Sequence, residues 1–148
     1  MVNTLFEYRD RGAYLLHEFV IMPDHIHLLL TPASNVNLAK AMMLIKGGGS
    51  HRIHKERDQK MQIWQEGFFD WTVRDENDWL AKVQYIQMNP VRARLVGRPE
   101  DWRYSSANSA FALDSMPRRI AGSVLGAKAP SFSSVVTPGL KPRPPKEL

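Results

Sequence analysis

Two histidines in a strand-like run are the first residues in this sequence suited to chemistry. His25 and His27 lie two residues apart in the segment HIHLLLT, which is rich in strand-forming side chains. Side chains alternate across a strand, so both imidazoles are expected on one face, where they could share a divalent cation. Two strand histidines are more often hydrogen-bonded or simply exposed, so the pair alone does not establish a metal site.

A tyrosine with an amide beside it is the second such feature. Residues 75–89 predict a helix, and at about 100° per residue its side chains divide into two faces. The expected core stripe holds Trp79, Leu80, Val83 and Ile86, and the polar face holds Asp78, Lys82, Tyr85 and Asn89. Asn89 lies one turn beyond Tyr85, and its amide oxygen is a suitable third ligand for a hard cation. The alternative is a half-exposed tyrosine and an asparagine that ends the helix before Pro90.

Together these residue types suit phosphoryl transfer. A divalent cation with open positions acts as a Lewis acid on a phosphate oxygen, and a positioned tyrosine hydroxyl can then attack phosphorus. Phenol has a pKa near ~10, so it leaves phosphorus more readily than a sugar oxygen does. A free DNA hydroxyl could therefore reverse the covalent bond, and a strand could be cut and rejoined without ATP.

The elements around the histidines predict an antiparallel hairpin. Residues 1–12 suit the end of an amphipathic helix, and residues 13–22 and 25–31 read as strands. Pro23-Asp24 between the strands suits a tight turn, because proline pre-sets φ and aspartate tolerates the turn geometry.

The rest of the chain predicts two helices and a third strand. Asn37 is a suitable N-cap for a helix from Leu38, and the three glycines at 47–49 are expected to interrupt that helix. Residues 64–73 are aromatic and partly alternating, as in a strand. Pro90 is expected to end the helix over 75–89, with a short second helix over 91–96. This order predicts an α+β fold with helices over an antiparallel sheet.

Composition bounds the class of protein. The chain has 148 residues, enough for one domain, and no cysteine, which excludes disulfides and thiolate metal sites. No apolar run is long enough to span a bilayer and no secretory signal is visible, so we expect a cytoplasmic protein with no membrane partner. The net charge is +5, and the segment 40–60 holds six basic and two acidic residues. That balance suits a polyanion, although a solvated helix face would explain it equally well.

Four blocks of the sequence resemble a known family. MPDHIHLLL (22–30), WQEGFFD (64–70), YIQMNPVRA (85–93) and WRYSSA (102–107) are similar to segments of the REP-associated tyrosine transposases, which belong to the single-tyrosine HUH transposases. The blocks occur in the family's order and cover residues 13–107.

The resemblance implies a fold, a mechanism and a substrate. It implies a ferredoxin-like antiparallel sheet with helices packed on it, and it matches His25 and His27 to the metal pair, Asn89 to the third ligand and Tyr85 to the nucleophile. The metal would be Mg²⁺ or Mn²⁺, and cleavage would leave a 5′-phosphotyrosine bond and a free 3′-hydroxyl. The partner would be single-stranded or hairpin DNA, often a repetitive extragenic palindrome, bound by a monomer or homodimer.

Several residues outside this group are expected to contact the DNA. Lys46, Arg52, Lys55 and Arg92 could follow the phosphates. One or two of the aromatic residues Trp64, Phe68, Phe69, Trp71 and Trp102 could stack on bases, and most of them are expected in the core.

The sequence also departs from the family. About a dozen residues precede Ala13, so the family's first strand is expected to be missing, which would leave an unpaired edge beside the histidine strand. Arg94 stands where relatives usually have glycine. We expect a transposase domain over residues 1–106, truncated at its N-terminus, and a low-complexity, largely disordered tail over 107–148.

Two other functions remain open on this sequence. The missing strand suits a degenerate module that binds hairpin DNA without cutting it. A metal-dependent phosphodiesterase, in which water attacks in place of Tyr85, would use the same residues.

Overall fold

The computed structural model describes residues 1–58, 60–118 and 134–137 of the chain. In chain order the elements are α1 (Val2–Asp10), β1 (Tyr14–Ile21), β2 (Ile26–Pro32), α2 (Leu38–Arg57), β3 (Phe69–Thr72), α3 (Glu76–Arg92), a 3-10 helix η1 (Pro99–Asp101) and β4 (Ser134–Thr137). The four strands form one antiparallel sheet in the order β1-β2-β4-β3. The predicted α+β fold, with helices packed on an antiparallel sheet, is confirmed.

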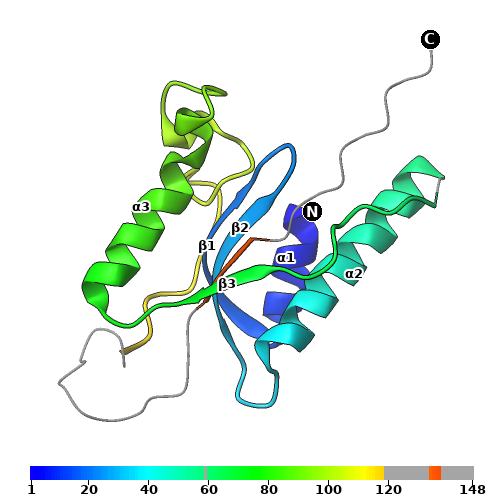
Figure 1. The fold of residues 1–148 in the computed structure, drawn as a ribbon, viewed down its shortest axis with the longest axis horizontal. Coiled ribbons are helices and arrows are strands. Elements are labelled where there is room, and N and C mark those ends of the chain that lie inside the picture. The colour runs from blue at the N-terminus through cyan, green and yellow to red at the C-terminus, as the bar shows by residue number, and fades with distance from the viewer. Residues whose placement is uncertain (59, 119–133, 138–148) are drawn as a thin grey trace.

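Helices cover both faces of the sheet (Figure 1). On one face, alternate residues of β1 and β2, including Leu16, Leu28 and Leu30, pack with α1 and α2 in the larger apolar core. On the other face, Leu29 and its neighbours form a second core with α3. The strands are therefore apolar nearly throughout, because both of their faces are buried.

The predicted hairpin is confirmed. β1 and β2 pair from Tyr14↔Pro32 to Ile21↔Ile26, and the turn between them is closed by a bond from the Met22 amide to the His25 carbonyl at 2.8 Å. The outer edge of β1 is covered by the segment 102–106, whose Tyr104 carbonyl accepts from the Ile21 amide at 2.9 Å. The block WRYSSA thus serves to close a sheet edge.

The expected unpaired edge beside the histidine strand is absent from the structure. β4 lies there, with Leu28 of β2 opposite Val136 and Leu30 opposite Ser134. On its other side β4 pairs with the whole of β3, from Phe69↔Thr137 to Thr72↔Ser134. β3 is at the end of the sheet and joins it through β4. A strand far along the sequence therefore completes the sheet beside β2.

The stretch that directly follows residue 106 also packs on the domain. Phe111 stacks on Phe6 of α1 with ring centroids 5.7 Å apart. The Asp114 carboxylate accepts from the Arg9 guanidinium at 2.7 and 2.8 Å and from the Leu16 amide at 2.8 Å. Residues 107–118 and β4 thus differ from the predicted disordered tail, and the rest of that prediction lies outside the described residues.

The glycines at 47–49 do not interrupt α2, which runs unbroken from Leu38 to Arg57 after the predicted N-cap, Asn37. At least one of these glycines has a packing role instead, because α1 approaches α2 closely at this point. A Cβ on Gly48 would lie 2.6 Å from the Tyr8 ring of α1, whereas a Cβ on Gly47 would meet nothing within 4 Å. Glycine is therefore needed at 48 so that α1 can approach α2, and not to bend the chain.

This contrast predicts opposite effects of two alanine substitutions. Gly47→Ala is expected to raise the free energy of unfolding by up to about 1 kcal/mol, because it improves helix propensity in open space. Gly48→Ala gains the same propensity but displaces the Tyr8 ring, and overpacking costs about 1–3 kcal/mol. Urea denaturation of both variants measures the difference, and equal stabilities would contradict the close approach.

The third strand is shorter than the sequence predicts. Of residues 64–73 only Phe69–Thr72 forms β3. Trp64 is drawn toward α2 instead, where its indole N–H donates to the Lys46 carbonyl at 2.9 Å and the ring joins the larger core. An aromatic run that mixes buried and exposed residues hides where the strand begins.

Pro90 does not end α3, which continues to Arg92. Pro90 is buried, and the helix stops within a turn beyond it. Proline has no N–H to donate to the carbonyl four residues earlier, but so near the end of the helix few other backbone hydrogen bonds are affected. The predicted helix over 91–96 is wrong. Arg94 follows α3 at a φ of 57°, a left-handed conformation that costs a side chain about 1–2 kcal/mol relative to glycine.

Among the described residues, no helix is both long enough and apolar enough to cross a membrane.

Candidate functional site

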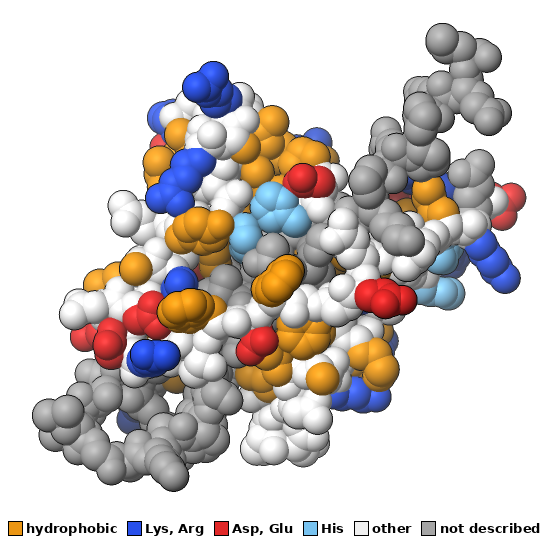
Figure 2. Space-filling model, viewed as in Figure 1, with side chains coloured by type: hydrophobic (Ala, Val, Ile, Leu, Met, Phe, Trp, Pro, Cys, Tyr) orange, Lys and Arg blue, Asp and Glu red, His pale blue; other side chains and the backbone are white. Residues whose placement is uncertain are grey.

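His25 directly precedes β2, His27 is the second residue of that strand, and the Tyr85 ring of α3 lies against His27. Ile26 and Leu28, which alternate with them, are buried in the core under α1 and α2, so His25 and His27 point to the opposite face. Their ring centroids are 4.7 Å apart at an interplanar angle of 76°. Figure 2 shows histidine side chains gathered on the surface near the hairpin, beside an acidic side chain. The predicted sharing of one face is confirmed.

The two imidazoles lie in different electrostatic surroundings. His27 is 5% exposed, and burial, with a smaller contribution from His25, lowers its pKa to about 4. His27 is therefore neutral at pH 7, which is the form that binds metals. The Asp24 carboxylate lies 2.6 Å from Nδ1 of His25. A proton held on Nδ1 by this carboxylate leaves Nε2 of His25 as the ligand atom.

α3 brings Tyr85 to this pair. The Tyr85 ring centroid lies 5.2 Å from that of His27, and its side chain is 41% exposed. The Arg92 guanidinium lies over the other part of the same ring, 5.3 Å from its centroid. The Tyr85 ring therefore contacts both His27 and Arg92 and remains partly exposed.

The helix faces were largely as the sequence predicts. Trp79 and Ile86 are buried and Val83 packs beside them, whereas Tyr85 and Asn89 are not in the core. The prediction that Leu80 belongs to the core stripe is wrong, because Leu80 is 56% exposed. The neighbouring Trp79 points into the interface instead, where its ring contacts that of His17 at 4.9 Å between centroids.

The donor set fits a hard divalent cation. Among the described residues, no cluster of three or more imidazole and carboxylate groups could hold a metal. The half-buried Asn89, one turn beyond Tyr85 on α3, could offer an amide oxygen as a third protein ligand. Two imidazoles and an amide oxygen would leave positions open on such a cation for a phosphate and water. The role of Asn89 as a ligand stays a prediction.

A half-buried carboxyl group next to the site was not found from the sequence. Glu18 of β1 is bonded to the Ser106 hydroxyl and accepts from the Gln87 amide of α3 at 3.2 Å. Burial raises the pKa of Glu18. Gln87 is two residues from Tyr85, so this group links the helix that carries Tyr85 to the sheet. Its two partners come from distant segments of the chain, and no local pattern reveals them.

The predicted DNA-contacting cations divide between the two faces. Arg92 lies in the site, whereas Lys46, Arg52 and Lys55 are on α2, which packs on the opposite face of the sheet. Lys46 donates to the carbonyls of Gln65 and Gly67, and Arg52 is paired with Glu7. The basic surplus of 40–60 is therefore not part of the histidine–tyrosine site.

The aromatic candidates for stacking also divide. Trp64 is buried, whereas Phe69 and Trp71 of β3 are 85% and 53% exposed. Trp71 is covered on one side by the Lys82 ammonium, 4.4 Å from the ring centroid. Trp102 is half-buried and its indole N–H donates to the Ile21 carbonyl at 2.9 Å.

The fold and site define an α+β domain that sets two strand histidines against a helix-borne tyrosine. A family model described as "Transposase IS200 like" matches residues 2–89, and the chain belongs to that family.

Curated relatives agree with the family. The chain is 34% identical over 96 residues to a Haemophilus influenzae protein provisionally named a REP-associated tyrosine transposase, covering 58% of this chain and 54% of that protein. It is 28% identical over 117 residues to the REP-associated tyrosine transposase of Escherichia coli, covering 78% and 67%. The chain thus spans about half to two thirds of these relatives. No solved structure matches it.

Proposed function

We propose that this chain cleaves and rejoins single-stranded DNA, with Tyr85 as the nucleophile and Mg²⁺ or Mn²⁺ held by His25, His27 and Asn89. The observation that carries the proposal is the 5.2 Å contact between the rings of His27 and Tyr85, in a chain of the IS200-like transposase family. The substrate class is hairpin DNA of the repetitive extragenic palindrome type, which the relatives' names suggest.

The residues divide the reaction between them. When bound, the cation supplies Lewis acidity to a phosphate oxygen. Tyr85 attacks phosphorus through its hydroxyl oxygen and loses the phenolic proton to solvent, which its exposure permits. A P–O bond to tyrosine forms and the bond to the 3′-oxygen breaks. The 3′-oxygen takes a proton from solvent, and the upstream strand leaves with a free 3′-hydroxyl. Attack by a 3′-hydroxyl on the phosphotyrosine reverses these steps.

Arg92 and Asp24 support this chemistry without entering it. Arg92 lies over the Tyr85 ring, so its guanidinium can pair with the phosphate that approaches the phenol. Asp24 orients His25 through Nδ1. Glu18, through Gln87, keeps α3 in register with β1.

The test is a covalent adduct whose label identifies the bond. Purified protein, Mn²⁺ and a 3′-labelled hairpin oligonucleotide with a single-stranded flank are expected to give a labelled protein band in denaturing gels. Peptide mass spectrometry should place the nucleotide on Tyr85, and EDTA should remove the reaction. A 5′-labelled oligonucleotide should release label free of protein. An adduct that keeps the 5′ label, or cut DNA with no adduct, would contradict the proposed intermediate.

A further inference from the structure

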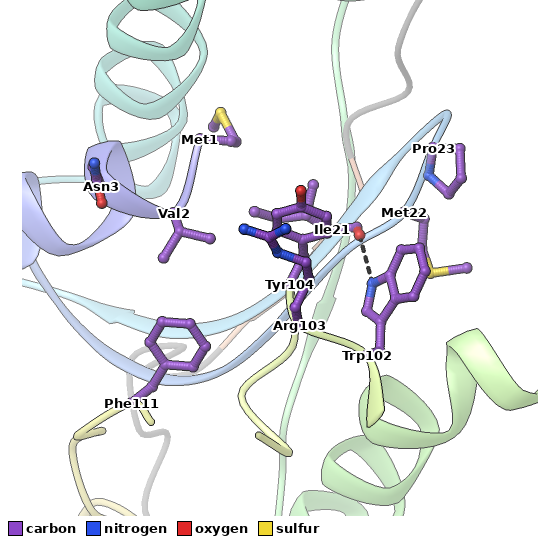
Figure 3. Close-up of a pocket in the computed structure, with 10 residues that line it drawn as sticks. All are labelled: Met1, Val2, Asn3, Ile21, Met22, Pro23, Trp102, Arg103, Tyr104 and Phe111. Atoms are coloured by element: carbon purple, nitrogen blue, oxygen red, sulfur yellow. Dashed lines mark hydrogen bonds between the residues drawn. The ribbon is translucent and has the colours of Figure 1, made fainter. Parts of the chain in front are cut away.

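A groove lies beside the hairpin turn, between the start of α1 and the segment 102–104. It has a volume of about 590 Å³ and is lined by the start of α1, the end of β1 with its turn, the segment 102–104 and Phe111 (Figure 3). That volume is within the ~300–1,000 Å³ of small-ligand sites. Its walls are fixed by the backbone, because Ile21 bonds through its amide to Tyr104 and through its carbonyl to the Trp102 indole, both at 2.9 Å.

The lining joins flat aromatic surface to a cation. The rings of Trp102 and Tyr104 have centroids 5.9 Å apart at an angle of 76°. The Arg103 guanidinium lies 4.9 Å from the Tyr104 ring centroid, and it has no acidic partner in the described part of the chain. Tyr104 is 40% exposed, and Asn3 adds an exposed amide at the rim. Figure 3 shows Arg103 and Tyr104 together at the centre of the groove.

The groove and the candidate site share the hairpin turn. Met22 and Pro23 line it, and the next two residues are Asp24 and His25. The bond from the Met22 amide to the His25 carbonyl makes these four residues one tight turn. A DNA strand with a phosphate at His25 would therefore have the groove within the reach of the same turn.

We propose that this groove holds one unpaired nucleotide of the DNA substrate, its base against Tyr104 and Trp102 and its phosphate on Arg103. This proposal rests on the proposed function for the identity of the polymer. Charge selects the occupant, because an unpaired guanidinium on a chain of net charge +5 favours an anion over an apolar peptide. Aromatic faces next to a cation suit a base with its phosphate.

The test measures base stacking in the absence of cleavage. Hairpin oligonucleotides carry 2-aminopurine at successive positions of the flank, and binding to the Tyr85→Phe protein is followed in EDTA. One position is expected to change its fluorescence on binding. Tyr104→Ala should abolish that change and raise the Kd roughly five- to 100-fold, the range that stacking on one aromatic ring contributes. The hairpin without its flank should bind both proteins equally.

Two further variants separate the phosphate contact from general charge. Arg103→Ala is expected to weaken binding of the flanked hairpin and to reduce its salt dependence, whereas Arg57→Ala, an exposed arginine at the end of α2, should not weaken it. Circular dichroism checks that each variant is folded. Unchanged affinity and fluorescence in folded Tyr104→Ala would overturn the proposal. Because these readouts need neither metal nor a nucleophile, loss of the Tyr85 adduct alone would count only against the proposed function.

Discussion

Replacing Tyr85 by Phe is expected to abolish the protein–DNA adduct and to leave DNA binding nearly unchanged. The substitution removes one hydroxyl, which is the atom that must form the bond to phosphorus. The ring contacts with His27 and Arg92 remain, so the helix keeps its place. A single hydrogen bond contributes about 0.5–1.5 kcal/mol, so the Kd should change by no more than about tenfold. Gel assays with 3′-labelled hairpins measure the adduct, and fluorescence anisotropy measures the binding.

A second tyrosine provides the matched control. Tyr8→Phe removes the same atom from α1, which packs on the face of the sheet away from the site. The Tyr8→Phe protein should form the DNA adduct at the same rate as the unmodified protein. If Tyr85→Phe still formed an adduct, Tyr85 would not be the nucleophile. If Tyr85→Phe still cut the DNA without an adduct, attack by water would replace the tyrosine mechanism.

Local signals in the sequence predicted the elements that carry the site. Pro23-Asp24 marked the turn, and alternation placed His25 and His27 on one face, because both depend on neighbouring residues alone. The same holds for Asn37, whose side chain accepts from the Lys40 amide as an N-cap should. The contact between His27 and Tyr85 joins residues far apart in the chain. It was predicted from the family resemblance, and periodicity could not have supplied it.

The errors arose where tertiary contacts override local propensity. Glycine at 48 weakens an isolated helix, but here it lets α1 and α2 touch, which no single-helix pattern contains. The position of β4 is the larger case. A short Ser/Val segment in a low-complexity stretch gives no reason to expect an inner strand, because its partners, β2 and β3, lie more than sixty residues earlier. Pairing on both sides stabilises a strand that propensity alone would not.

Placing proline at position 135 of β4 is therefore expected to damage the whole sheet. Val135 is opposite Leu29 on one side and Trp71 on the other, and a proline there removes an N–H from a strand paired on both edges. Each unsatisfied polar group in such a position costs about 1–3 kcal/mol. Leu29 is two residues from His27, so adduct formation should fall together with the free energy of unfolding. Val135→Thr, which keeps the N–H and favours strands, should retain both.

A disulfide across the β3–β4 pair tests the position of the strand directly. The chain has no cysteine, so Thr72→Cys with Ser134→Cys introduces a single possible bridge. These residues are opposite each other in the register, where Cα atoms of antiparallel strands lie ~4.5–5.5 Å apart, within the range that a disulfide spans. Oxidation is expected to give an intramolecular bridge and a monomer in non-reducing gels. The pair Thr72→Cys with Val136→Cys, displaced by two residues, should bridge less readily. Covalent dimers would mean that β4 is exchanged between two copies, and no bridge at all would contradict the completed sheet.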